Sequence, residues 1–182
     1  MIISSIIFIV FMGILGRLSG NGFGTKWGVS WLPEVLFAIP FGVAFGWAVG
    51  NPFLSIPAAF VSYLGMQSAT WYFLRWKSHD DPNTKRGGTL KPIVDWLAAL
   101  AGWKLGDEGY AWVAAGLKGF IIGLPVGGVL TAILWPLGYE IGSHMKVHTE
   151  RFGIEPQAVS EFLSAAFSGV SILVFIEIIK GI

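Results

Sequence analysis

Five long apolar stretches constrain this chain more than any other feature of its sequence. Of its 182 residues, 54% are hydrophobic and 13% are charged, about half the charged fraction of a typical soluble domain. Each stretch is close to the roughly 17 to 25 residues that a transmembrane helix needs. We therefore predict an all-α, polytopic integral membrane protein that forms one membrane domain over residues 1–182. The five predicted spans cover residues 2–18, 33–49, 53–74, 118–137 and 158–179.

The distribution of basic residues predicts how the spans are oriented. The N-terminal run carries no basic residue before its apolar part, so we interpret it as a retained helix rather than a signal peptide. If five spans alternate, ten Lys and Arg residues collect on one side, and only Lys146 and Arg151 lie on the other. Because cytoplasmic loops are enriched in Lys and Arg, the N-terminus is predicted outside and the C-terminus in the cytoplasm. The second span, 33–49, is short enough to be re-entrant instead.

The longest polar segment, residues 75–92, lies between the third and fourth spans. Residues 93–105 follow with apolar side chains at helical spacing, which predicts an amphipathic helix at the membrane surface. A helix that packs on the protein's own cytoplasmic part fits the pattern equally well. At the membrane surface, five residues would contact anionic lipid headgroups: Lys85, Arg86, Lys91, Trp96 and Trp103. The net charge of +1 does not favour a nucleic-acid partner.

Small residues recur at intervals of four in two apolar parts of the chain. In lipid, helices associate through close van der Waals contact, which small residues allow. Pro40 and Pro125 lie inside the two stripes and are expected to kink the helices. The stripes either hold the helices of one bundle together or face symmetry mates, as in the glycine zippers of homo-oligomeric channels, which they resemble. The stripes consist of Ala38, Gly42, Gly46 and Gly50, and of Ala115, Gly119, Gly123 and Gly127.

Two groups of ionisable residues are candidates for chemistry. Lys118 lies in the apolar stretch 110–135, and an ionisable residue at membrane depth is a candidate for function. Its long side chain could instead reach the lipid headgroups. Glu140, His144 and His148 are spaced to share one helical face, where they could bind a divalent metal or respond to pH. A solvated helical face is the alternative, because the sequence offers no obvious fourth ligand.

Three segments cover about the middle third of the chain and carry a resemblance. Their sequences are DPNTKRGGTLKPIVDWLA, GLPVGG and LWPLGYEIGSH. Together they resemble segments of small uncharacterised membrane proteins encoded by tailed phages. The resemblance implies a location in a bacterial inner membrane and a role such as lysis, superinfection exclusion or membrane remodelling. It implies no active-site residues.

These features favour a non-enzymatic membrane protein, a homo-oligomeric pore or channel that packs through the glycine stripes. Its partners would be the lipid bilayer and either further copies or another membrane protein. The alternatives are a structural or interaction subunit of a membrane complex, and a membrane enzyme or metal-binding protein that uses Glu140, His144 and His148. We expect no cofactor, and the lack of cysteine excludes disulfides and thiol catalysis.

Overall fold

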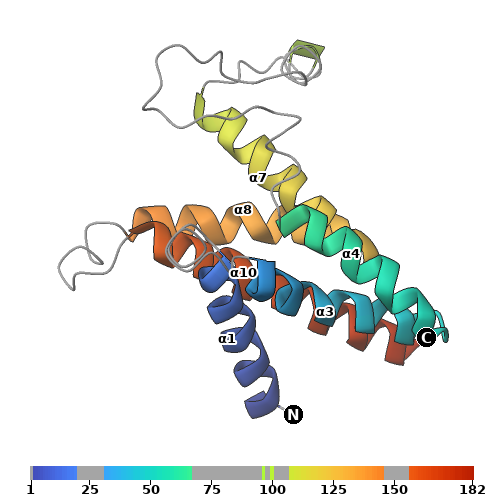
Figure 1. Ribbon diagram of the computed structural model, residues 1–182. Helices are drawn as coiled ribbons and strands as arrows, with labels where there is room; N and C mark the ends of the chain where they lie inside the picture. The colour runs from blue at the N-terminus through green and yellow to red at the C-terminus, as the bar shows by residue number, and fades with distance from the viewer. Residues whose placement is uncertain (1, 20–30, 67–95, 97–98, 101–106, 146–155) are drawn as a thin grey trace.

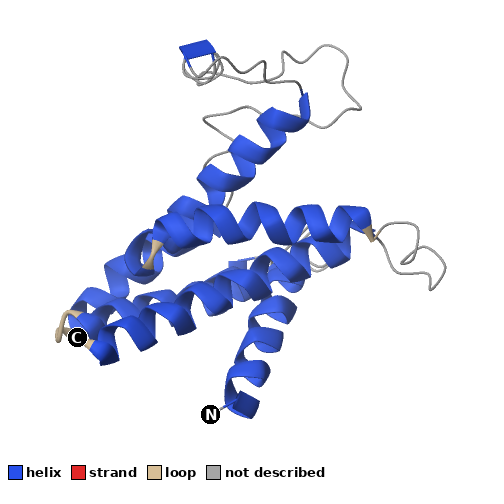
Figure 2. Ribbon diagram, turned by 180° about the vertical axis from the view of Figure 1, so that it is seen from behind, coloured by secondary structure: helices blue, strands red, loops and turns tan. Residues whose placement is uncertain are grey.

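The computed structural model describes residues 2–19, 31–66, 96, 99–100, 107–145 and 156–182. All regular structure in these residues is helical (Figure 1, Figure 2), which confirms the predicted all-α class. The helices and 3-10 turns are α1 (Ile2–Ser19), α3 (Trp31–Ala48), η1 (Pro52–Leu54), α4 (Ser55–Met66), α7 (Asp107–Gly123), η2 (Leu124–Val126), α8 (Gly128–His144) and α10 (Pro156–Gly181).

Three helices among the described residues are long and apolar enough to cross a membrane. They are α1, α3 and the Ala158–Gly181 part of α10, and they coincide with three of the predicted spans. The predicted span 53–74 begins as η1 and α4, which together form a shorter apolar helix up to Met66. The coarser prediction, a helical chain with membrane-spanning potential, therefore agrees with the structure.

Most of the predicted polar loop and surface helix lies outside the described residues. Trp96 is described, and its side chain is exposed. The amphipathic helix over 93–105 stays a prediction, as do the headgroup contacts of all five residues, of which Lys85, Arg86, Lys91 and Trp103 lie outside the described residues.

The fourth predicted span, 118–137, is not one helix in the structure, because two helices share it. The chain leaves α7 at Gly123, passes through η2 and enters α8. Pro125 lies in η2, and Gly127 follows it with φ +100°, a left-handed conformation that glycine adopts without strain. Pro40, in contrast, lies inside α3, which continues through it to the end of the helix. Of the two prolines expected to kink a helix, Pro125 lies where the helix is interrupted and Pro40 lies within a continuous helix.

α7 and α8 form an antiparallel hairpin in which small residues of α7 face α8. A Cβ atom at Gly123 would overlap the Thr131 side chain, and one at Gly119 would lie 2.7 Å from the Cβ atom of Trp135. Gly127 belongs to the turn between the helices, where its Cβ position is 4.0 Å from the nearest atom. The last residue of this predicted stripe is therefore a turn residue rather than a helix contact.

The stripe on α3 also faces a helix of the same chain. A Cβ atom at Gly42 would overlap the backbone of Ser55 and lie 2.7 Å from the Ala59 side chain. One at Gly46 would overlap the Ser55 hydroxyl. Gly50, which was predicted to extend this stripe, lies in the turn after α3 at φ +68° and has no atom within 4 Å of its Cβ position. Both glycine faces are thus filled from within the chain.

α10 packs against α8 and α1 and forms the most extensive helix contacts of the described part. Gly138 of α8 lies against the backbone of Leu163 and Ser164, and Gly142 lies against that of Ser160. These two pairs show that α8 and α10 run antiparallel with their backbones close together. The largest fully buried apolar side chains lie where the helices meet: Phe37, Phe41, Met12, Ile122, Ile172 and Val126.

Both termini lie at the same end of the molecule. α1 and α10 are antiparallel, because Arg17 pairs with Glu161 while Gly169 packs on Met12. The last turns of α1 and α8 and the first turns of α3 and α10 therefore gather at one end, which we call the cluster end. The N- and C-termini lie away from it, both in the lower part of Figure 1. Five alternating spans would instead place the two termini at opposite ends.

Candidate functional site

The tip of the α7–α8 hairpin is partly buried, and Leu124 is its most exposed large side chain, at 51%. Ile122 and Val126 have no exposed surface, and η2 contacts α3, α4 and α10. The Ser62 hydroxyl of α4 donates a 2.6 Å hydrogen bond to the carbonyl of Ile122, where the helix breaks. The Thr131 amide donates to the carbonyl of Gly127 at 3.1 Å. Inside a bilayer, such irregular backbone must find its hydrogen bonds within the protein or in water, and the carbonyls of Ile122 and Gly127 find theirs within the protein.

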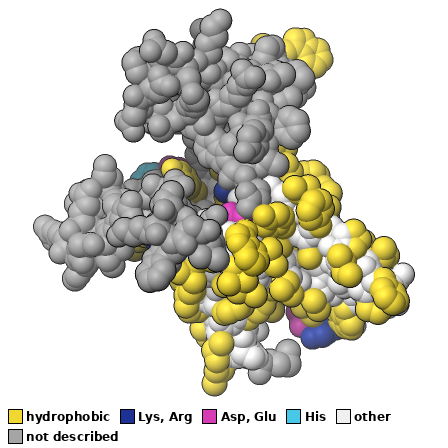
Figure 3. All heavy atoms as spheres, viewed as in Figure 1, with side chains coloured by type: hydrophobic (Ala, Val, Ile, Leu, Met, Phe, Trp, Pro, Cys, Tyr) yellow, Lys and Arg dark blue, Asp and Glu magenta, His cyan; other side chains and the backbone are white. Residues whose placement is uncertain are grey.

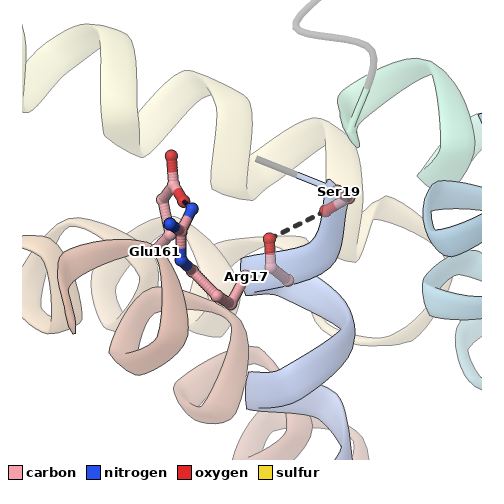
Figure 4. A network of polar contacts seen from close by, with 4 residues as sticks. Arg17, Ser19 and Glu161 are labelled. Carbon is pink, nitrogen blue, oxygen red and sulfur yellow. Dashed lines mark hydrogen bonds and ion pairs between the residues drawn. The ribbon is translucent and has the colours of Figure 1, made fainter. Parts of the chain in front are cut away.

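Four charged residues from four different helices form what we call the charge cluster: Arg17, Glu34, Lys118 and Glu161. The Arg17 Nη1 atom lies 2.9 Å from Glu161 Oε2, an ion pair that joins α1 to α10 (Figure 4). Next to it, the Ser19 hydroxyl donates a 2.9 Å hydrogen bond to the Gly16 carbonyl at the end of α1. Glu34, in the first turn of α3, is 7% exposed.

The ammonium group of Lys118 is directed into the protein. Lys118 as a whole is partly buried, and its Nζ atom lies 5.4 Å from the ring centroid of the buried Trp135. The same ammonium interacts electrostatically with Glu161 and, less strongly, with Glu34. Lysine over an aromatic face and beside carboxylates is a stabilising arrangement for a cation that has lost much of its water. The side chain therefore belongs to the charge cluster.

Among the described residues, the charge cluster consists of two basic and two acidic side chains. Removing a charge from water costs several kcal/mol, and only a nearby opposite charge with good hydrogen bonding offsets that cost. Each of the four helices contributes one member, so these four charges come together only when the helices are assembled. At this end of the molecule, the packing of the four helices therefore determines which charged side chains lie close together.

Sequence reasoning identified Lys118 but missed its partners. Arg17, Glu34 and Glu161 were not singled out from the sequence as its partners. The available signal was the presence of acidic residues inside apolar helices, since a carboxylate at such a place needs a cationic partner. Which cation pairs with which carboxylate is a matter of tertiary structure, because the pairs are far apart in the chain.

A row of buried hydroxyl groups extends along α10 from the charge cluster. The Ser164 hydroxyl donates a 2.9 Å hydrogen bond to the Trp135 carbonyl of α8. Ser168 donates within its own helix, to Ala165 at 2.6 Å. These hydroxyls give α10 a polar face that begins beside Glu161 and follows the α8 and α1 contacts. The row consists of Ser160, Ser164, Ser168 and Ser171, none of them more than 3% exposed.

The predicted metal ligands are only partly described. Glu140 and His144 share a helical face, and His144 Nδ1 lies 3.3 Å from Glu140 Oε1 and 3.0 Å from the Glu140 carbonyl oxygen. Both side chains are well exposed, and His148 lies outside the described residues. Among the described residues, no group of three or more His, Cys, Asp or Glu side chains could hold a metal ion. The pair resembles a solvated helical contact.

The ion pair in the charge cluster gives a direct stability prediction. We expect Glu161→Gln to lower the free energy of unfolding by about 1–3 kcal/mol, because Arg17 and Lys118 lose a partly buried counter-charge. Glu177→Gln is the matched control, since its pair with Lys180 at 3.0 Å is well exposed and is worth about 0–1 kcal/mol. Thermal unfolding in mild detergent measures both, and equal losses at the two positions would contradict the prediction.

The hairpin tip and the charge cluster together form the candidate functional site. They share α7 and α8, which carry Lys118 and Trp135, and they meet at the contact of these helices with α10. Comparison with models of protein families, with curated proteins and with solved structures gave no match for this chain.

Proposed function

We propose that this chain is a non-enzymatic integral membrane protein that forms a permeation path for a small ion. The observation that carries this proposal is the helix break between α7 and α8, which packs against α3, α4 and α10 and belongs to the same hairpin as Lys118. Broken helices and re-entrant segments are typical of the ion and substrate sites of channels and transporters. An ionisable residue inside an apolar helix marks such paths as well, and Lys118 lies within the apolar stretch 110–135. Both features occur here on the same pair of helices, α7 and α8.

Membrane insertion is supported by the apolar surface of the described helices. Hydrophobic side chains cover the described part of the face in Figure 3, over α1, α3 and α4, and acidic and basic side chains reach the surface near its centre. Ile3, Phe53 and Ile56 are each more than 70% exposed. A water-soluble protein seldom exposes so many large apolar side chains together, whereas acyl chains provide a matching environment. The lipid bilayer is the proposed partner of this surface.

The hairpin changes the proposed orientation in the membrane. We propose that α7 and α8 enter and leave on one side, so that the connections 20–30, 67–106 and 146–155 share that side. Enrichment of basic residues then assigns it to the cytoplasm of a bacterial inner membrane and both termini to the outside. Lys180 would be the one basic residue near the outer side. Ten of the twelve Lys and Arg residues would lie at the cytoplasmic side: Arg17, Lys26, Arg75, Lys77, Lys85, Arg86, Lys91, Lys104, Lys146 and Arg151.

The homo-oligomer remains part of the proposal, but with a different interface. α4 fills the glycine face of α3, and α8 fills the glycine face of α7. Further copies, or another membrane protein, would therefore contact other apolar surfaces. The alternative role as an interaction subunit depends on the segment 75–105, most of which lies outside the described residues.

Ion flux through reconstituted protein tests the proposed function. Purified protein in liposomes should carry potassium or chloride down a gradient faster than empty liposomes, as followed with a potential-sensitive dye. Thr131→Val is the matched variant, because it keeps the side-chain shape and removes a buried hydroxyl that faces the hairpin turn. We expect it to alter the flux without unfolding the protein. Folded protein that passes neither ion would contradict the proposal.

A further inference from the structure

We infer that the turn between α3 and α4 lies among the acyl chains of the outer leaflet and binds lipid there, instead of projecting into water. The α3–α4 turn comprises residues 49–51 and η1 (Pro52–Leu54). It lies opposite the cluster end, because α3 begins at the cluster end, and both views show it beside the C-terminus (Figure 1, Figure 2). The inference rests on the membrane location and orientation in the proposed function, and it assigns a lipid contact to the outer side.

The side chains of the α3–α4 turn are apolar and exposed. Phe53 is 81% exposed, and Ile56, just after the turn, is 73% exposed. No Asp, Glu, Lys, Arg or His occurs in the sequence between Glu34 and Arg75. The exposed large apolar residues at or next to the turn are Trp47, Val49, Phe53, Leu54 and Ile56. Exposed apolar side chains that gather in this way mark a contact with a partner or a membrane.

The backbone amides of the α3–α4 turn are all hydrogen-bonded within the chain. Three of them donate to carbonyls of α3 at 3.0, 3.1 and 2.9 Å, and they belong to Val49, Gly50 and Asn51. Asn51 Oδ1 accepts a 3.1 Å hydrogen bond from the Phe53 amide, and the Asn51 carbonyl accepts one of 3.1 Å from the Leu54 amide. Pro52 has no amide hydrogen. A turn in water does not require such internal bonding of every amide, whereas a turn in lipid does.

The length of α3 agrees with a turn inside the outer leaflet. Its 18 residues rise about 27 Å, while the hydrocarbon core of a bilayer is about 30 Å thick. With its first turn at the cytoplasmic boundary, α3 therefore ends before the hydrocarbon does. The 26 residues of α10 rise about 39 Å, and its last turns carry the exposed pair of Glu177 and Lys180. At the outer end, the charges that mark the water boundary thus lie on α10 and are missing from the α3–α4 turn.

Acyl chains fit this surface better than a second copy of the chain does. Every residue from 49 to 54 is exposed, so no single face of the turn stands out as an interface. Fluid acyl chains adapt to such a shape. Trp47, which is 54% exposed in the last turn of α3, suits the region just below the headgroups, where tryptophan is enriched. The partner of the turn is therefore the part of the acyl chains that lies beneath the outer headgroups.

Collision measurements on a spin label test this placement. The chain has no cysteine, so Phe53→Cys carries a single nitroxide when the full chain is labelled and placed in vesicles of phosphatidylcholine and phosphatidylglycerol. Oxygen concentrates among acyl chains, whereas a neutral nickel chelate stays in water, and power-saturation EPR measures the collision rate with each. We expect the ratio of oxygen to nickel collisions to be severalfold higher at Phe53→Cys than at Ile182→Cys. Ile182 is the matched control, because it is 98% exposed, lies at the same end and follows the charged Lys180.

The two collision rates distinguish lipid from water and from protein. Frequent collisions with nickel at Phe53→Cys would put the turn in water and overturn the inference. Rare collisions with both reagents would show that protein, such as a second copy, covers the turn, and would overturn it too. Ile56→Cys, in the first turn of α4, provides the same readings if Phe53→Cys does not fold.

A charge in the α3–α4 turn provides an independent measurement. Asn51→Asp keeps the oxygen that accepts from the Phe53 amide and adds a negative charge, and Asn51→Ser keeps a capping oxygen without the charge. In water these residues are similar caps, so the two variants would unfold at the same temperature. Among acyl chains a charge is costly, so in lipid nanodiscs we expect Asn51→Asp to unfold several degrees below Asn51→Ser. Equal unfolding temperatures would contradict a turn in lipid.

The outcome for the α3–α4 turn is separable from the outcome for the permeation path. A lipid-exposed label at Phe53→Cys in a protein that passes no ion supports the placement of the turn and contradicts the proposed path. Ion flux together with frequent nickel collisions at Phe53→Cys supports the path and overturns the placement of the turn.

Discussion

Substituting Gly138→Leu should abolish the folded state. A Cβ atom at Gly138 would lie 2.7 Å from the carbonyl carbon and oxygen of Leu163 and from the amide nitrogen of Ser164. These are backbone atoms, so no flexible side chain can move aside, and α8 and α10 must separate. Overpacking of a core costs about 1–3 kcal/mol when side chains adjust, and we expect at least the upper end of that range here. The separation would also break the hydrogen bond from Ser164 to the Trp135 carbonyl.

Size-exclusion chromatography and thermal unfolding in detergent measure this effect. Gly181→Leu is the matched control, because it makes the same change at a glycine with no atom within 4 Å of its Cβ position. The control should elute and unfold like the wild-type protein, whereas Gly138→Leu should aggregate or lose its cooperative transition. A Gly138→Leu protein as stable as the control would show that α8 and α10 do not approach closely.

Cysteine labelling should place both termini on the same side of the membrane, opposite to the end of α8. We expect Ile2→Cys and Ile182→Cys to react with an impermeant maleimide in intact cells and Met145→Cys to react only after permeabilisation. All three positions are exposed, and the chain contains no other cysteine, so each variant carries a single reactive thiol. The effect is close to all or none, because a thiol on the closed side is protected by the bilayer.

The same three variants separate the hairpin from five alternating spans. Alternating spans place Ile2 and Met145 outside and Ile182 in the cytoplasm. With the hairpin, the two termini always react together and Met145→Cys reacts under the opposite condition. Labelling of all three after permeabilisation is the control for accessibility. Reaction of Ile2→Cys and Met145→Cys in intact cells, without Ile182→Cys, would exclude the re-entrant arrangement.

The helical class and the membrane-spanning potential could be predicted from the sequence because both depend on local properties. In lipid, a run of about 20 apolar residues can hydrogen-bond all its backbone N–H and C=O groups within itself only as a helix. This holds whatever segments surround it. The runs 2–18, 33–49 and 158–179 follow this rule and correspond to helices in the structure. The repeated spacing of small residues likewise indicated close helix contacts, although not which helices make them.

The composition of the charge cluster could be recognised only from the tertiary structure. Arg17, Glu34, Lys118 and Glu161 lie on four helices, and the sequence shows that charges occur in apolar helices but not which of them meet. A charged side chain in an apolar helix needs a partner of opposite charge. How the helices pack decides which residue that partner is. Arg17 and Glu161 are 144 positions apart in the sequence, so no local signal indicates that pair.

The hairpin shows the division between sequence and structure most clearly. By itself, the sequence determined that the chain forms apolar helices. Each apolar segment in lipid must hydrogen-bond its own backbone, and a helix does this without help from other segments. It did not distinguish Pro40, which α3 accommodates, from Pro125, where the chain reverses. The tertiary structure decided between them, since the buried carbonyl of Ile122 accepts a hydrogen bond from the Ser62 hydroxyl of α4, and η2 packs against α3 and α10.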